Sequence, residues 1–91
     1  MIQRVLRIEN RLGLHARAAA KLVQLAGRFK ADIHLSRLHA NQQINARSIL
    51  GILMLAATQG TELVVTLQGE DESAAARAIE DLFVGKFGET A

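Results

Sequence analysis

Apolar and polar side chains alternate in several short stretches of the chain, which is the period-two pattern of strands with one buried face. The alternation predicts strands over residues 2–8, 32–36 and 62–68. A polar stretch from Arg37 to Asn41 leads into a further short run that ends at Ile44, and this order predicts a β-hairpin. The chain is therefore expected to contain four strands, two of them joined by a turn.

Three other stretches place apolar residues three and four positions apart, the spacing of one face of a helix. The first predicted helix covers residues 16–28. The second covers residues 49–55, where apolar residues lie nearly all round and Gly51 weakens the helix. The third follows the acidic residues 70–72, which suit the positive end of a helix, and it ends at Gly85. The predicted order of elements is βαββαβα.

This order of elements predicts an α+β fold. Strands with one apolar face need a single layer of helices to cover them, so we expect a small antiparallel or mixed sheet covered on one face. The 91 residues allow one hydrophobic core, and we therefore expect a single domain over residues 1–91.

Composition narrows the classes of protein to which the chain can belong. It contains no cysteine, which excludes disulfides, thiol nucleophiles and thiolate-bound metals. No apolar run approaches the roughly 20 residues of a membrane span, and the first residues lack the apolar centre of a signal peptide. The basic residues are dispersed, the net charge is only +2, and there is no Tyr or Trp on which bases could stack. We expect a cytoplasmic protein with no membrane insertion and no nucleic-acid partner.

His15 and Arg17 are the candidate chemical residues. They fall where a strand pattern gives way to the first helical pattern, so an imidazole and a fixed positive charge lie at a helix N-terminus. Free backbone N–H groups and the helix dipole favour an anion there, and neutral imidazole is a nucleophile that can accept a phosphoryl group. Each residue taken singly has a structural alternative: a lone histidine often caps or packs, and Arg17 could be an ordinary solvated residue.

The neighbours of His15 add to this hypothesis. Three small alanine side chains follow at residues 18–20, so we expect a flat surface beside the imidazole that suits a large partner. Leu14 is expected to anchor the loop in the core. His34 and His39 are assigned to the surface, and no metal site is expected, because nothing in the sequence sets the spacing of metal ligands.

Ser48 has two compatible interpretations. Its hydroxyl is placed to cap the helix predicted over residues 49–55, which is worth on the order of 1 kcal/mol. A phosphate on the same hydroxyl would also suit the positive end of that helix. The helix itself has too many apolar residues for one buried stripe, so some are expected to remain exposed as a docking patch, with dense core packing as the alternative.

Two segments of the chain resemble motifs of one known family. Residues 10–19, Asn-Arg-Leu-Gly-Leu-His-Ala-Arg-Ala-Ala, resemble the active-site segment of HPr, the histidine phosphocarrier of the bacterial phosphotransferase system. Residues 44–52, Ile-Asn-Ala-Arg-Ser-Ile-Leu-Gly-Ile, resemble the regulatory-serine segment of that family. The resemblance implies an open-faced β-sandwich, in which three helices cover one face of a four-stranded antiparallel sheet. One difference is Ala18, where the family usually has a proline that shapes the first helical turn.

The resemblance also implies a role for each candidate residue. His15 would accept a phosphoryl group from enzyme I, which takes it from phosphoenolpyruvate, and donate it to an EIIA-type protein, while Arg17 would steady the group. Ser48 corresponds to the serine that an ATP-dependent HPr kinase/phosphorylase modifies in some bacteria. A shared partner surface is implied at Ala16, Ala20, Ile49, Leu50 and Leu53.

The sequence therefore predicts a monomeric phosphocarrier without a cofactor rather than an enzyme. The sugar-uptake and nitrogen-related branches of the system share the active segment, so an HPr-like regulatory module of the nitrogen-related branch, acting mainly by protein binding, is the alternative. A hydrolase or transferase with His15 as general base ranks last. It would need a cleft and an orienting carboxylate, and Glu9 is the only acidic residue expected near the imidazole.

Overall fold

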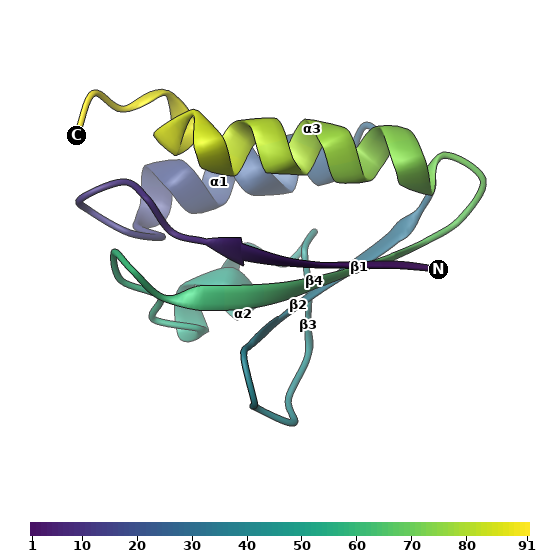
Figure 1. Cartoon of the computed structure of the whole chain (residues 1–91), viewed down its shortest axis with the longest axis horizontal. Coiled ribbons are helices and arrows are strands. Elements are labelled where there is room, and N and C mark those ends of the chain that lie inside the picture. The colour runs from purple at the N-terminus through teal and green to yellow at the C-terminus, as the bar shows by residue number, and fades with distance from the viewer.

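Four strands form one antiparallel sheet in the computed structural model, which describes residues 1–91 (Figure 1). The strands are β1 (Ile2–Arg7), β2 (Asp32–Arg37), β3 (Ile44–Asn45) and β4 (Glu62–Gln68). Their order across the sheet is β1-β4-β2-β3, so the last strand of the chain lies between β1 and β2. The antiparallel pairing of β2 with β3 confirms the predicted hairpin, although β3 has only two residues.

Three α-helices accompany the sheet: α1 (Ala16–Ala26), α2 (Ile49–Met54) and α3 (Glu72–Val84). Helices α1 and α3 run side by side over the sheet (Figure 1), and α2 packs against α1 and β3. The α+β class and the order βαββαβα are confirmed. A short 3-10 helix, η1 (Lys86–Gly88), follows α3, and no pattern in the sequence predicts it.

One face of the sheet is buried and the other is open. The register aligns Val65 of β4 with Arg4 and Leu35, and the fully buried strand residues on this side are Ile33, Leu35, Leu63, Val65 and Leu67. Ile52 of α2 belongs to the same core of 21 apolar residues as the buried side chains of α1 and α3, so all three helices share this side. Val5, on the opposite face, stays exposed. The predicted cover on one face is confirmed.

Phe87 ties the C-terminal segment to the core. Its side chain is fully buried, and the centroid of its ring lies 5.0 Å from that of Phe83, with the two planes at 54°. Burying such a side chain contributes roughly 1.5–3 kcal/mol. The chain reaches this position through left-handed backbone at both Lys86 and Phe87, each with a φ of 56°, which costs an ordinary residue about 1–2 kcal/mol. The two left-handed residues together cost about 2–4 kcal/mol, so burial of the ring offsets much of the backbone strain and fixes the start of the tail.

Asp71, the residue that precedes α3, fixes the turn after α1. Its two carboxylate oxygens accept hydrogen bonds from the backbone N–H groups of Lys30 and Ala31, at 2.8 and 2.9 Å. Glu72 likewise accepts from the N–H of Gly69, at 3.0 Å. These backbone donors stabilise the charged carboxylates, so they lower the pKa of Asp71 and of Glu72 below the ordinary values of 3.8 and 4.5.

The protein is expected to lose stability in acid. A carboxyl group whose pKa is lowered on folding stabilises the fold above its ordinary pKa, and this contribution disappears as the pH falls through the lowered folded value. The free energy of unfolding should therefore decline below about pH 4.5, and it should decline less steeply in Asp71→Asn. Urea unfolding followed by circular dichroism at decreasing pH measures this. Glu70→Gln, at an exposed position, is the control; equal slopes for wild type and Asp71→Asn would contradict the prediction.

Candidate functional site

A tight loop presents His15 at the start of α1. Gly13 adopts left-handed backbone with a φ of 69°, and a Cβ at this position would lie 2.5 Å from the carbonyl oxygen of Ala57. The N–H of Leu14 donates to that same oxygen at 2.9 Å, and the Leu14 side chain is buried, as predicted. The absence of a side chain at Gly13 thus permits the close approach that sets where His15 emerges.

The His15 imidazole pairs with a carboxylate from the far end of the chain. His15 is the N-cap residue of α1, but its side chain does not cap the helix. Instead its Nε2 lies 2.6 Å from Oε2 of Glu89, and its Nδ1 forms no hydrogen bond. The side chains of His15 and Glu89 are 28% and 13% exposed, so the pair is partly shielded from water while the ring remains accessible.

The surroundings of Glu89 decide which nitrogen of the ring carries the proton. The hydrogen bond from His15 is the main cause that lowers the pKa of the Glu89 carboxyl below its ordinary 4.5, and a hydrogen bond from Asn10 and the charge of Arg17 add to it. An ionised carboxylate only accepts hydrogen bonds, so Nε2 carries the proton. The lone pair of the neutral ring then lies on Nδ1, which is the nucleophilic nitrogen.

Glu89 is the site residue that the sequence analysis missed. It lies 74 positions from His15, beyond the last predicted helix, and no local spacing links the two. The expectation that Glu9 would be the only acidic residue near the imidazole is therefore wrong. An orienting carboxylate is thus present beside the imidazole, but none of the hollows in the structure is lined by His15, so the imidazole lacks the cleft that a hydrolase needs.

Basic side chains gather around a hollow beside the tail. The hollow has a volume of about 380 Å³, and Arg11, Arg17, Lys21 and residues 88–91 are among those that line it. Lys21 Nζ donates to the carbonyl oxygen of Phe87 at 2.6 Å. Arg17 is exposed and forms neither an ion pair nor a hydrogen bond. Its guanidinium is therefore available to an incoming anion.

The surface of α1 differs in part from the expectation. Ala18 and Ala19 are fully buried in the core, so the prediction that they form a flat surface beside the imidazole is wrong. Ala16 is exposed and Ala20 is half-buried, one turn apart on the outer side of the helix. Of the alanines at residues 16 and 18–20, only Ala16 and Ala20 are therefore open to a partner.

Helix α2 presents apolar side chains outward. Ile52 is the fully buried residue of the helix, whereas Ile49, Leu50 and Leu53 are exposed, Leu50 by 70%. Met54, at 78% exposed, extends this apolar surface beyond the residues predicted to form it. The predicted exposure of apolar residues on this helix is confirmed.

Ser48 caps α2. Its Oγ accepts a hydrogen bond from the N–H of Gly51 at 3.1 Å, which confirms the predicted cap. A Cβ at Gly51 would lie 3.2 Å from both Ile44 Cβ and Ser48 Oγ. The glycine that weakens the helix by itself therefore lets the helix pack closely against β3 and its own cap.

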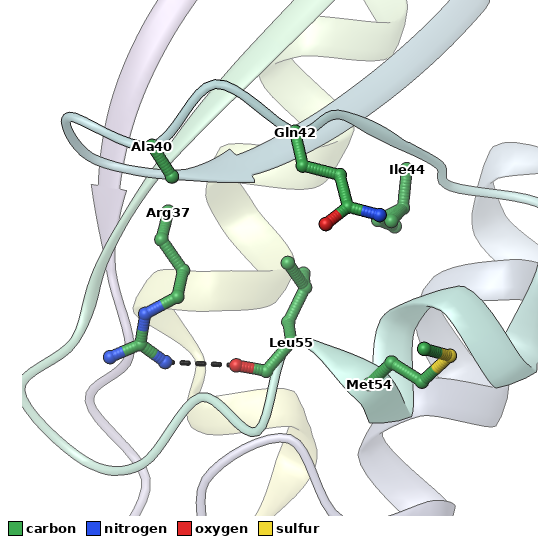
Figure 2. A pocket seen from close by; sticks show the side chains of 6 residues that line it. All are labelled: Arg37, Ala40, Gln42, Ile44, Met54 and Leu55. Atoms are coloured by element: carbon green, nitrogen blue, oxygen red, sulfur yellow. Dashed lines mark hydrogen bonds between the residues drawn. The ribbon is translucent and has the colours of Figure 1, made fainter.

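A second hollow lies between the β2–β3 hairpin and α2, away from His15 (Figure 2). Its volume is about 180 Å³, and it is lined by Arg37, Ala40, Gln42, Ile44, Met54 and Leu55. Arg37 Nη1 donates to the carbonyl oxygen of Leu55 at 2.8 Å, so the one charged group of this hollow is already engaged. The hollow holds no group suited to chemistry.

The other two histidines lie apart from the site. His34 is half-buried in β2 on the open face of the sheet, and His39 is exposed in the turn that follows β2, which agrees with their predicted assignment to the surface. No group of three or more acidic or histidine side chains is placed to hold a metal ion. None of the helices combines the length and the apolarity that crossing a membrane requires.

The chain matches one protein family along most of its length. A family model described as "PTS HPr component phosphorylation site" matches residues 2–84. The phosphocarrier protein HPr of Xylella fastidiosa (strain Temecula1) is 45% identical over 89 residues, which are 98% of each chain. The crystal structure of HPr-C-His from Thermoanaerobacter tengcongensis is 40% identical, covers 100% of both chains and has a TM-score of 0.93. An HPr dimer from the same organism is also 40% identical, over 98% of this chain and 100% of the other, with a TM-score of 0.76.

These matches agree with the observed sheet, with its three helices and with the histidine at the start of α1. The chain belongs to the HPr family, the phosphocarrier proteins of the phosphotransferase system, which carry a phosphoryl group and are not themselves enzymes.

Proposed function

We propose that the chain accepts a phosphoryl group on Nδ1 of His15 from enzyme I and passes it to an EIIA-type protein. The observation that carries this proposal is the pairing of Nε2 with the Glu89 carboxylate, which leaves the lone pair on Nδ1. The partial exposure of the ring at the start of α1 supports it as well, because a partner protein has to reach the nitrogen.

The proposed transfer uses the Glu89 carboxylate in both directions. When His15 is phosphorylated, a bond forms between Nδ1 and phosphorus, and the bond from phosphorus to the donor breaks with its electron pair leaving on the donor. The ring keeps its proton on Nε2 and becomes positively charged, and the carboxylate 2.6 Å away balances that charge. In the onward step a nucleophile of the acceptor protein forms a bond to phosphorus, the bond from Nδ1 to phosphorus breaks with its electron pair returning to Nδ1, and a neutral imidazole leaves.

The start of α1 is suited to hold the phosphoryl group between the two steps. The backbone N–H groups of the first turn lack partners within the helix, and the helix dipole makes this end positive. There is no acidic residue in that turn to oppose an anion. The unpaired guanidinium of Arg17 adds a fork of donors, so we assign it the role of steadying the phosphoryl oxygens.

The proposed partner surface consists of exposed or half-exposed residues on α1 and α2, which pack against each other. Its members are all apolar: Ala16, Ala20, Ile49, Leu50 and Leu53. Covering exposed apolar area favours association by roughly 25 cal/mol per Å² before the entropy and desolvation costs of binding are subtracted. Both partners must reach the same imidazole, so enzyme I and the EIIA-type protein are expected to bind one at a time.

We further propose that the transferring species is a monomer in the cytoplasm, the compartment in which phosphoenolpyruvate is made. A related HPr forms a dimer, so the oligomeric state has to be measured under transfer conditions. Light scattering during the reaction should give the mass of one chain. A dimer that transfers as fast as the monomer would contradict this part of the proposal.

Incubation with phosphoenolpyruvate and enzyme I tests the proposed function. The wild-type protein is expected to gain a single acid-labile phosphate, which nitrogen and phosphorus NMR should place on Nδ1. The phosphate should disappear when an EIIA-type protein is added. A reaction without enzyme I is the control and should give no labelling. Phosphate on Nε2, or no phosphate in the complete reaction, would count against the proposal.

Ser48 is proposed as a second phosphorylation site, for an ATP-dependent HPr kinase/phosphorylase. Its exposed hydroxyl adjoins Ile49 and Leu50, so a charge there would enter the apolar surface that a partner must cover. Ser48→Asp is expected to slow transfer from enzyme I about tenfold in rapid-quench measurements. Ser48→Asn is the matched control, because asparagine also caps helices but carries no charge. Equal transfer rates for the two variants would argue against this placement of the partner surface.

A further inference from the structure

Asn10 holds the carboxylate that orients the imidazole. We infer that Asn10 is a positioning residue: its side-chain amide aligns the Glu89 carboxylate, so that the second carboxylate oxygen accepts the hydrogen bond from the Nε2–H of His15. This inference deepens the proposed function, on which it rests, because it names what keeps Nδ1 free. Asn10 makes no hydrogen bond to the ring itself and acts through Glu89.

The contacts of Asn10 link the two ends of the chain. Asn10 is fully buried, and its Nδ2 donates both to the carbonyl oxygen of Gly13, at 2.8 Å, and to Oε1 of Glu89, at 3.2 Å. The other oxygen of that carboxylate lies 2.6 Å from Nε2 of His15. One amide thus connects the loop before α1 with the tail after α3, across 79 positions of sequence.

The direction of the Asn10 amide is fixed by its neighbours. Its Oδ1 is buried and has no hydrogen-bond partner. Reversing the amide would turn this oxygen toward two other acceptors, the Gly13 carbonyl and the Glu89 carboxylate, so Nδ2 has to face them. A buried acceptor without a partner destabilises the fold, and an apolar side chain of similar size would avoid that penalty. The amide is therefore explained by what its nitrogen holds rather than by packing.

The tail backbone does not depend on Asn10. Lys21 and the backbone N–H of Arg11 hold carbonyl groups of the tail separately. The carboxylate of Glu89, by contrast, is bonded only by Asn10 and His15. Removing the amide should leave the tail in place and free the carboxylate to turn away from the ring.

NMR of the ring nitrogens measures the ratio of the two neutral tautomers of His15 in the unphosphorylated protein. The wild type is expected to carry its proton almost entirely on Nε2. Asn10→Leu, which keeps the size but removes the donor, should raise the population with the proton on Nδ1 about tenfold. Asn10→Ala gives a second measurement in case the leucine variant fails to fold. Asn41→Leu, at an exposed position between β2 and β3, is the control and should have no effect.

A double-mutant cycle with Glu89→Ala separates this role from support of the loop. If Asn10 acts through Glu89, Asn10→Leu shifts the tautomer ratio and slows phosphoryl transfer severalfold in the wild-type background, but has little effect in the Glu89→Ala background. Equal effects in both backgrounds, or an unchanged tautomer ratio, would overturn the inference. The tautomer ratio is read without any phosphate, so a protein that showed this coupling but accepted no phosphate would contradict only the proposed function.

Discussion

Replacing His15 by alanine is expected to abolish the uptake of phosphate from phosphoenolpyruvate and enzyme I. The nucleophile itself is removed, so the rate should fall by at least about a thousandfold. No other imidazole can take its place, because His34 lies on the open face of the sheet and His39 in the turn after β2. Neither is near the free N–H groups at the start of α1. Quantification of acid-labile phosphate measures the loss.

The alanine variant should fold normally, which makes the result interpretable. The His15 side chain neither caps α1 nor belongs to the core, and thermal unfolding followed by circular dichroism checks this. His34→Ala and His39→Asn are matched controls; asparagine is chosen because His39 has a φ of 69°, which asparagine tolerates. Phosphate retained by His15→Ala, or lost from either control, would contradict the assignment of His15.

Replacing Gly13 by alanine is expected to be the most destabilising change in the loop that carries His15. The added Cβ would lie 2.5 Å from the carbonyl oxygen of Ala57 and would occupy a residue with left-handed backbone. The loop must then retreat, which breaks the bond from the Leu14 N–H to that oxygen. We expect the free energy of unfolding to fall by about 3 kcal/mol, the combined effect of backbone strain and a lost buried contact. Chemical denaturation measures it.

Gly27→Ala provides the matched control for this prediction. Gly27 has ordinary right-handed backbone with a φ of −67°, and a Cβ there would lie 3.4 Å from its nearest neighbour, the carbonyl oxygen of Val23. Its effect on stability should stay within about 0.5 kcal/mol. A Gly13→Ala variant as stable as Gly27→Ala would show that the loop can move without loss, and the close approach to Ala57 would then not position His15.

The sheet and its helices could be predicted because the spacing of apolar residues within each segment indicates which face of the strand or helix is buried. In β4, Leu63, Val65 and Leu67 alternate with polar or less buried residues, and the predicted bounds of 62–68 are those observed. Local sequence also predicts the cap at Ser48, since a serine before an apolar run is a common helix cap. It predicts that His15 lies at a helix N-terminus, because a strand pattern stops and a helical pattern begins there.

The helical spacing also indicates which side of α1 its small residues face. Ala18 and Ala19 precede Leu22 by four and three positions, and all three are buried in the core. A flat alanine surface is predicted only if the small size of these side chains is considered without this spacing. Side-chain size says nothing about which side of a helix a residue faces.

The tail could not be predicted because its position depends on contacts between distant parts of the chain. Its course depends on left-handed backbone at Lys86 and Phe87, which are ordinary residues without a glycine-like signal. Its part in the proposed site is a carboxylate that meets a ring 74 positions away. The sequence identifies Asn10 only as a loop residue, because its contact with Glu89 depends on the position of the tail.

In the tail, the residue that packs in the core and the residue that contacts the imidazole are different. Phe87 is the last buried residue of the core, and Glu89 follows it two positions later. Removal of residues 89–91 would leave every core side chain in place and yet release the imidazole from its carboxylate. Because it loses hydrogen bonds of the tail but no core side chain, such material is expected to melt close to the intact protein and to differ from it in transfer. The measured mass of a preparation is therefore a better guide to its competence than its melting temperature.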